Sequence, residues 1–317
     1  MNLEKKPSSF FHTAHRPMLT RIFAFFLNVS PGLKRFVWKR LYQHLASKYP
    51  TDEWTYMNYG YESCDQPLAI PLKEEEERDR YMIQLYHHVA TAVDLKDKDV
   101  LEVGSGRGGG SSYIKRYLSP KSMTGIDYSK NAIKFSNNHH SVDGLSFIHG
   151  DAENLSFADE SMDAIVNVES SHCYGSMKKF VAQVHRVLRQ GGYFLFADLR
   201  PAEKIEELDQ TFKDAGFEVI KKELISKEVV KALDAFHEVK LAFFQEMVTG
   251  WLRKPLNDFA GVKGSNIHVD TPIFRTVNLN NKFTVYDTKK VYDQVQDPGG
   301  IGLFKGAHEY SRAGSEV

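Results

Sequence analysis

Apolar residues in the middle of the chain occur in short runs separated by amphipathic stretches. The runs lie at residues 99–103, 122–126, 145–149, 162–168 and 193–199. Continuous apolar runs of this length are typical of strands buried on both faces. The clearest intervening helix is predicted at 177–189, with apolar residues at helical spacing and Gly191 closing it. This alternation predicts an α/β fold with a doubly wound, mostly parallel sheet.

The flanking segments have different patterns. Residues 73–80 form a charge run that predicts the solvated start of a helix. Residues 274–279 and 282–286 predict a hairpin at a sheet edge, turning at Asn280-Asn281. The predicted organisation is therefore a helical extension (1–50), a core (51–226 with 261–290), a helical cap inserted at 227–260, and a flexible tail (291–317).

Composition narrows the function classes. The chain of 317 residues carries 41 basic and 41 acidic side chains and a formal net charge of zero, so no basic field favours nucleic acid. Its two cysteines give no disulfide framework and fit a reducing, cytoplasmic compartment. No metal site is expected, because the chain has no cysteine–histidine cluster with zinc spacing and no carboxylate cluster.

An apolar stretch at residues 18–27, flanked by arginines and lysines, is far shorter than the roughly 20 residues that span a bilayer as a helix. Two alternatives are open. The stretch packs on the core as an amphipathic helix, or it makes a peripheral membrane contact. The oligomeric state is left open.

A glycine-dense turn follows the first predicted strand, with glycines at 104, 106 and 108–110. Glycine permits positive φ and close approach of a ligand to the backbone. Exposed N–H groups where the next helix begins would favour an anionic group. Asp127, Asp151 and Asn167 follow or end the next strands, and ligands of doubly wound sheets lie at those carboxyl ends.

This ordered set, together with Leu188–Gly192, resembles class I S-adenosylmethionine-dependent methyltransferases. The resemblance implies a seven-stranded Rossmann-like sheet and S-adenosylmethionine as cofactor. Glu102 would hold the methionine moiety or the glycine loop, Asp127 the ribose hydroxyls, and Asp151 with Ala152 the adenine. The predicted cofactor-binding residues are Tyr61, Glu102, Gly104, Gly106, Asp127, Tyr128, Asp151, Ala152, Asn167 and Val168.

Other interpretations of these residues stay open. Asp127 could be a helix N-cap, and Asp151 could cap a turn. A dinucleotide-binding enzyme is the runner-up, since Gly104, Gly106 and Gly109 match G-x-G-x-x-G. That match follows from glycine density, and the stretches 150–154 and 188–192 fit methyltransferases instead.

Narrower motifs at 58–62, 150–157, 167–174 and 191–201 resemble the phthiotriol and phenolphthiotriol dimycocerosate methyltransferases. This resemblance implies O-methylation of a lipid, a polyketide or another small hydrophobic acceptor. Sterol C-methyltransferases share the core signatures more loosely, so C-methylation of a sterol-like substrate remains an alternative. A non-catalytic cofactor-binding protein is the alternative outside enzymes.

An alcohol acceptor needs a base, because an aliphatic hydroxyl is a poor nucleophile until its proton is removed. His172, just past the fourth predicted strand, is the candidate base, since histidine titrates near neutrality. Glu169 is the second predicted catalytic residue, either orienting His172 or forming a wall of the cofactor pocket. Asp198 could bind substrate or a metal, or cap a loop. Tyr56, Tyr59 and Tyr61 could close the site.

Overall fold

The computed structural model describes residues 55–236 and 281–290. The predicted N-terminal extension, the C-terminal tail and most of the predicted cap lie outside these residues. Within them, the cap region begins with α8 (Ser226–Ala235). The charge run forms a short 3-10 helix, η1 (Glu74–Asp79), that leads into α3 (Arg80–Ala90).

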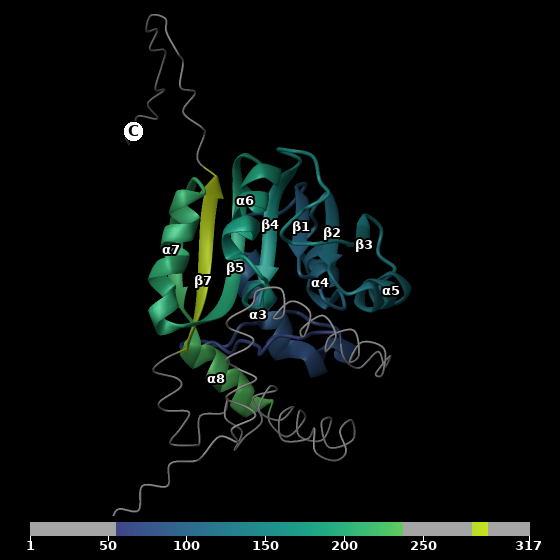
Figure 1. The fold of residues 1–317 in the computed structure, drawn as a ribbon. Helices are drawn as coiled ribbons and strands as arrows, with labels where there is room; N and C mark the ends of the chain where they lie inside the picture. Colours follow the sequence, from purple (N-terminus) through teal and green to yellow (C-terminus); the bar gives the residue numbers. More distant parts are fainter. Residues whose placement is uncertain (1–54, 237–280, 291–317) are drawn as a thin grey trace, which may run out of the picture.

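One seven-stranded sheet organises the fold, with the strand order β3-β2-β1-β4-β5-β7-β6 (Figure 1). The strands β1 to β5 pair in parallel, whereas β7 is antiparallel to both β5 and β6. Their bounds are β1 (Asp99–Val103), β2 (Ser122–Asp127), β3 (Leu145–His149), β4 (Met162–Val168), β5 (Leu188–Pro201), β6 (Phe217–Leu224) and β7 (Asn281–Lys290). The predicted doubly wound, mostly parallel sheet is confirmed.

The central strands β1 and β4 and most of β5 are buried on both faces, as their apolar runs predict, whereas β3 and β6 at the ends of the sheet are only partly buried. Along β1, Val100 packs into one core cluster and Leu101 into the other. The remaining helices that connect or cover the strands are α4 (Gly109–Leu118), α5 (Lys130–His139), α6 (Met177–Val187) and α7 (Ile205–Asp214). Residues of α3, α4 and α8 contribute to the first cluster, and residues of α6 and α7 to the second.

The predicted hairpin at a sheet edge is wrong for its second strand. β7 lies inside the sheet, bonded to β5 along one side and to β6 along the other. Tyr286 is fully buried there, with its ring centroid 5.1 Å from that of Phe212 and 6.0 Å from that of Phe196. Burial of this aromatic residue accounts for the place of β7 inside the sheet instead of at its edge. Residues 274–279 lie outside the described residues.

The helix predicted at 177–189 ends two residues earlier, at Val187. Leu188 already pairs with Met162 of β4, so the chain enters β5 without a separate turn. Gly191, with φ 73°, lies within β5 beside a register shift instead of closing the helix.

Candidate functional site

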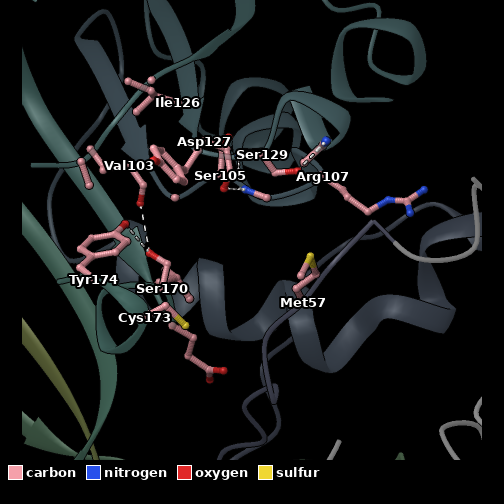
Figure 2. A pocket seen from close by; sticks show the side chains of 18 of the residues that line it. Met57, Val103, Ser105, Arg107, Ile126, Asp127, Ser129, Ser170, Cys173 and Tyr174 are labelled. Atoms are coloured by element: carbon pink, nitrogen blue, oxygen red, sulfur yellow. Dashed lines mark hydrogen bonds between the residues drawn. The ribbon is translucent and has the colours of Figure 1, made fainter. Parts of the chain in front are cut away.

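A pocket lies at the carboxyl ends of β1, β2 and β4 and beside the turn after β3 (Figure 2). It encloses about 1250 Å³ of space free of protein atoms, part of it open to solvent. Most of the predicted site residues come together in its lining: Gly104, Gly106, Asp127, Tyr128, Asp151, Ala152, Val168 and Glu169.

The glycine loop is held by hydrogen bonds within the protein. The N–H groups of Gly104 and Ser105 donate to the carbonyl oxygen of Ile126 (2.8 and 3.0 Å), and that of Gly108 donates to Ser105 (2.9 Å). The N–H of Gly106 donates to Oδ2 of Asp127 (2.9 Å). At these four positions the loop uses its N–H groups to hold its own shape, so the predicted anion contact stays with the N–H groups where α4 begins, at Gly109.

Glycine is required in the loop for space as well as for conformation. Gly104 has φ 79°, and a Cβ there would lie 2.3 Å from Oγ of Ser170. At Gly106 (φ 53°), by contrast, the nearest atom to a Cβ would be Sδ of Met57 at 3.4 Å. The side of the loop at Gly106 is therefore open toward the pocket, as a bound ligand requires.

Asp127 ends β2 and presents its carboxylate to the pocket. Its Oδ2 accepts from Gly106 and its Oδ1 from the N–H of Ser129 (2.7 Å). A carboxylate has about four acceptor positions, so a diol can still donate to both oxygens. The alternative of a helix N-cap is wrong, because the cap of α5 is Ser129, which accepts from the N–H of Ala132 (3.3 Å). Burial raises the pKa of Asp127.

The turn after β3 forms the neighbouring wall. Oδ1 of Asp151 accepts from the N–H of Glu153 (3.0 Å), so Asp151 caps this turn while it lines the pocket. Oε1 of Glu153 accepts in turn from the N–H groups of Gly175 and Ser176 (2.8 and 3.1 Å), which ties this wall to the start of α6. The half-exposed Tyr128 stacks on His149.

Two predicted cofactor residues lie behind the pocket lining. Glu102 is fully buried and accepts from Tyr86 Oη (2.7 Å) and from Ser111 Oγ. Burial raises its pKa to about 7, against the lowering effect of these two hydrogen bonds. Asn167, also fully buried, donates through Nδ2 to the carbonyl of Val103 (2.7 Å). Both side chains support the ends of the strands that carry the loop.

The three candidate tyrosines lie in different surroundings. The Tyr61 ring stacks on His88 (4.3 Å between centroids), outside the pocket lining, and Tyr56 packs on Tyr86. Tyr59 lies nearest the predicted catalytic residues, and its N–H donates to Oε2 of Glu169 (3.0 Å). Burial raises the pKa of Tyr59, and the charges of Glu169, Cys173 and Asp198 raise it further.

His172 is held by Asp198, at the end of β5. Its Nδ1 lies 2.7 Å from Oδ1 of Asp198, and its backbone N–H donates to Oδ2 (2.9 Å). Arg200 pairs with the same carboxylate (3.0 Å). The His172 side chain keeps 27% of its surface exposed but lies outside the lining of the described pocket. Burial opposes the charged imidazolium, but the Cys173 sulfur and Asp198 raise the pKa of His172 well above its usual value.

Several lining residues were not singled out from the sequence. Met57 and Ser129 carry no chemical signature, and only their place beside the 58–62 motif and after Asp127 could have indicated them. Arg107, in the glycine loop, is almost fully buried with its guanidinium carbon 3.6 Å from the centre of the Phe135 ring. The charge of Arg107 gave no hint of this burial.

The described residues contain no group of three or more histidine, cysteine, aspartate or glutamate side chains placed to hold a metal ion. Across residues 55–236 and 281–290, no helix is both long and apolar enough to cross a membrane.

Comparison with known proteins supports the cofactor expected at this pocket. Residues 101–196 match a family model described as a methyltransferase domain. The chain is 38% identical over 249 residues to a phthiotriol/phenolphthiotriol dimycocerosates methyltransferase of Mycobacterium leprae, covering 78% of this chain and 92% of the relative. It is 41% identical over 220 residues to a fatty-acid O-methyltransferase of Mycolicibacterium smegmatis, covering 68% of this chain and 80% of the relative.

Solved structures share the fold at low identity. The [4+2]-cyclase SpnF matches with a TM-score of 0.62 and 17% identity over 80% of this chain and 94% of that one. The geranyl diphosphate C-methyltransferase of Streptomyces coelicolor, solved with S-adenosyl-L-homocysteine, matches with a TM-score of 0.56 and 15% identity. The match covers 79% of this chain and 98% of that one.

The pocket has the features that S-adenosylmethionine requires, namely an open backbone at Gly106 and a carboxylate at Asp127 with acceptor positions left for a ribose. The fold, the family model and the identity with curated methyltransferases agree with this site. The chain belongs to the class I S-adenosylmethionine-dependent methyltransferases.

Proposed function

We propose that this methyltransferase methylates an oxygen atom of a lipid or of another hydrophobic acceptor. The observation that carries the proposal is the 41% identity to a fatty-acid O-methyltransferase over 80% of that relative's length. The phthiotriol methyltransferase, at 38% identity, has a name that also refers to a lipid. A peripheral membrane contact through residues 18–27 would suit such an acceptor, although these residues lie outside the described part of the chain.

When bound, S-adenosylmethionine supplies an electrophilic methyl group on a sulfonium ion. In our proposal, Asp127 accepts the ribose hydroxyls and the turn at Asp151 and Ala152 contacts the adenine. The loop at Gly104 and Gly106, with Val168 at the end of β4, borders the methionine end of the cofactor. Glu102 and Asn167 act from behind by holding the strand ends.

The acceptor side is proposed to lie near His172. Because Asp198 occupies Nδ1, the nitrogen left to exchange a proton with an acceptor is Nε2. The raised pKa of His172 keeps the imidazolium form at neutral pH, so an alcohol would react faster as the pH increases. A carboxylic acid is already ionised at neutral pH and needs no base. The two acceptor classes therefore differ in the expected pH dependence.

The test is a transfer assay with the full chain and S-adenosylmethionine carrying a trideuterated methyl group. Three acceptors are supplied separately: a long-chain fatty acid, a long-chain secondary alcohol and a sterol. Mass spectrometry locates the label, and mild alkali removes it from a methyl ester but not from an ether or a carbon. Labelled ester or ether supports the proposal, and label only on carbon contradicts it. No transfer to any acceptor by a chain that binds the cofactor favours the non-catalytic alternative.

A further inference from the structure

The segment 55–60, here named the strap, crosses the cofactor pocket opposite the turn after β4. The N–H of Tyr59 donates a hydrogen bond across the pocket to Oε2 of Glu169 (3.0 Å). We propose that Glu169 is a positioning residue that latches the strap over the cofactor pocket, and that it does so as a hydrogen-bond acceptor instead of as a charge or a base. This inference rests on the proposed cofactor site.

The backbone of Glu169 is fixed in an unusual conformation. Its φ is 45°, in the left-handed region that non-glycine residues rarely adopt. Its N–H donates to the carbonyl oxygen of Ala197 (2.8 Å), which ties this strained residue to β5. Such strain persists where the surroundings impose it, and it is concentrated at ligand sites. The conformation gives the carboxylate its direction toward the strap.

The strap is also attached to α3 on its other side. Nδ2 of Asn58 donates to the carbonyl of Met82 (3.2 Å), and Oδ1 of Asn58 accepts from the N–H of Gly60 (2.9 Å). Just after the strap, the N–H of Tyr61 donates to the carbonyl of Tyr81 (2.9 Å). Glu169 therefore holds the strap from the opposite wall of the pocket.

The strap directs one side chain at the cofactor loop. Tyr56 and Asn58 are buried, whereas Met57 between them is 37% exposed and lines the pocket. Figure 2 shows Met57 beneath the loop that carries Ser105 and Arg107, with its sulfur directed toward that loop. Its Sδ is the nearest atom to the open side of Gly106. With the latch in place, Met57 covers this end of the pocket and limits the access of water.

A glutamine at position 169 separates the proposed role from a charged one. The amide oxygen of glutamine accepts a hydrogen bond but carries no charge and takes no proton. If Glu169 were a base, or if its charge stabilised the sulfonium cation, glutamine would be as harmful as alanine. If Glu169 is a latch, glutamine should replace it.

The test combines ligand titration with amide hydrogen exchange on the full chain. Glu169→Ala should bind S-adenosylmethionine and S-adenosylhomocysteine roughly 10-fold more weakly, as expected for the loss of one hydrogen bond. Glu169→Gln should stay within about threefold of the wild type. Met57→Ala should also weaken ligand binding. In the Met57→Ala protein, adding Glu169→Ala should lower the affinity by a smaller factor than Glu169→Ala does in the wild type, because both residues act by closing the same end of the pocket.

Hydrogen exchange tests the latch without any ligand. The Tyr59 amide should lose protection in Glu169→Ala and keep it in Glu169→Gln. Glu218→Ala removes an exposed carboxylate of β6 and is the matched control, with unchanged binding and exchange. If Glu169→Ala does not fold, Glu169→Gly removes the side chain and also relieves the left-handed strain.

Three results would overturn the latch. The first is unchanged hydrogen exchange at the Tyr59 amide in a folded Glu169→Ala protein. The second is a loss of ligand affinity in Glu169→Gln as large as that in Glu169→Ala. The third is a loss of affinity in Glu169→Gln for the cationic S-adenosylmethionine but not for S-adenosylhomocysteine. A different result would contradict the cofactor site on which the latch rests: the wild type would bind neither ligand, although exchange of the Tyr59 amide would change in the Glu169 variants as expected.

Discussion

At the scale of single residues, Asp198 determines the electrostatics beside the turn after β4. Burial alone would raise its pKa, yet Arg200 and His172 hold this pKa well below its usual value. The carboxylate is therefore ionised and buried between two cations, bonded to Nδ1 of His172 and to Arg200. Removing one member of such a group leaves buried charge uncompensated.

The ion pair predicts a dependence of stability on pH. The raised pKa of His172 in the folded state means that its stabilising effect is complete below the unfolded pKa of about 6.5 and is lost as the pH rises through the folded value. As the pH rises above about 6.5, the free energy of unfolding of the wild type should therefore fall relative to that of His172→Gln. Urea denaturation across this range measures both proteins, and parallel curves would contradict the pairing.

His172 also carries a prediction about turnover. If the acceptor is an alcohol, His172→Ala should lower kcat by roughly 100-fold, a typical loss for a general base. The affinity for S-adenosylmethionine should be kept, because His172 does not line the described cofactor pocket. Steady-state kinetics and calorimetry measure the two quantities. Undiminished kcat on an alcohol would refute the role as a base, and equal losses in kcat and affinity would indicate a structural role.

At the scale of elements, the contact between α3 and α4 determines where the glycine loop can lie. A Cβ at Gly110 would lie 2.0 Å from Cε1 of Tyr86, and that ring is fixed because its hydroxyl donates to Glu102. Gly110→Ala should therefore destabilise the fold by about 2 kcal/mol, because steric overlap outweighs the gain in helix propensity of about 1 kcal/mol.

Chemical denaturation of Gly110→Ala tests this contact. Lys134→Ala, at an exposed position of α5, is the matched control and should change stability by less than about 0.5 kcal/mol. A Gly110→Ala protein as stable as the wild type would show that α4 can move away from α3.

The insertion of β7 between β5 and β6 depends on Tyr286. Its ring packs on Phe196 and Phe212, and its hydroxyl donates to Oδ1 of Asp209 (2.6 Å). Tyr286→Ala should lower the free energy of unfolding by about 3–5 kcal/mol, whereas Tyr286→Phe, which loses only the hydrogen bond, should lower it by about 1 kcal/mol. Thermal unfolding of both variants separates the two contributions. Equal losses of stability in the two variants would mean that the hydroxyl, not the ring, holds β7 in place.

At the scale of the whole molecule, the parallel half of the sheet could be predicted from the sequence, because its central strands β1, β4 and β5 are largely buried and form continuous apolar runs. The place of β7 could not be predicted, because its partners are distant in sequence and its burial depends on Tyr286 meeting Phe196 and Phe212.

The same limit applies to the site. Asp127 and Asp151 could be placed from the sequence, because strand ends meet at one edge of a parallel sheet. The bond between Tyr59 and Glu169 spans 110 residues, and the pairing of His172 with Asp198 spans 26. No local pattern indicates which of several polar residues meet in space. The sequence left Glu169 either to orient His172 or to form a wall of the cofactor pocket; the structure pairs His172 with Asp198 and places Glu169 in the pocket lining.

The most direct test of the cofactor site is a calorimetric titration of S-adenosylmethionine and S-adenosylhomocysteine into the wild type, Asp127→Ala and, as a control, Asp143→Ala at an exposed position. The wild type and the control should bind both ligands alike. Asp127→Ala should bind both at least about 10-fold more weakly, because in the proposed site its carboxylate accepts the ribose hydroxyls, and it also fixes the N–H of Gly106. A folded Asp127→Ala protein with wild-type affinity would contradict this site.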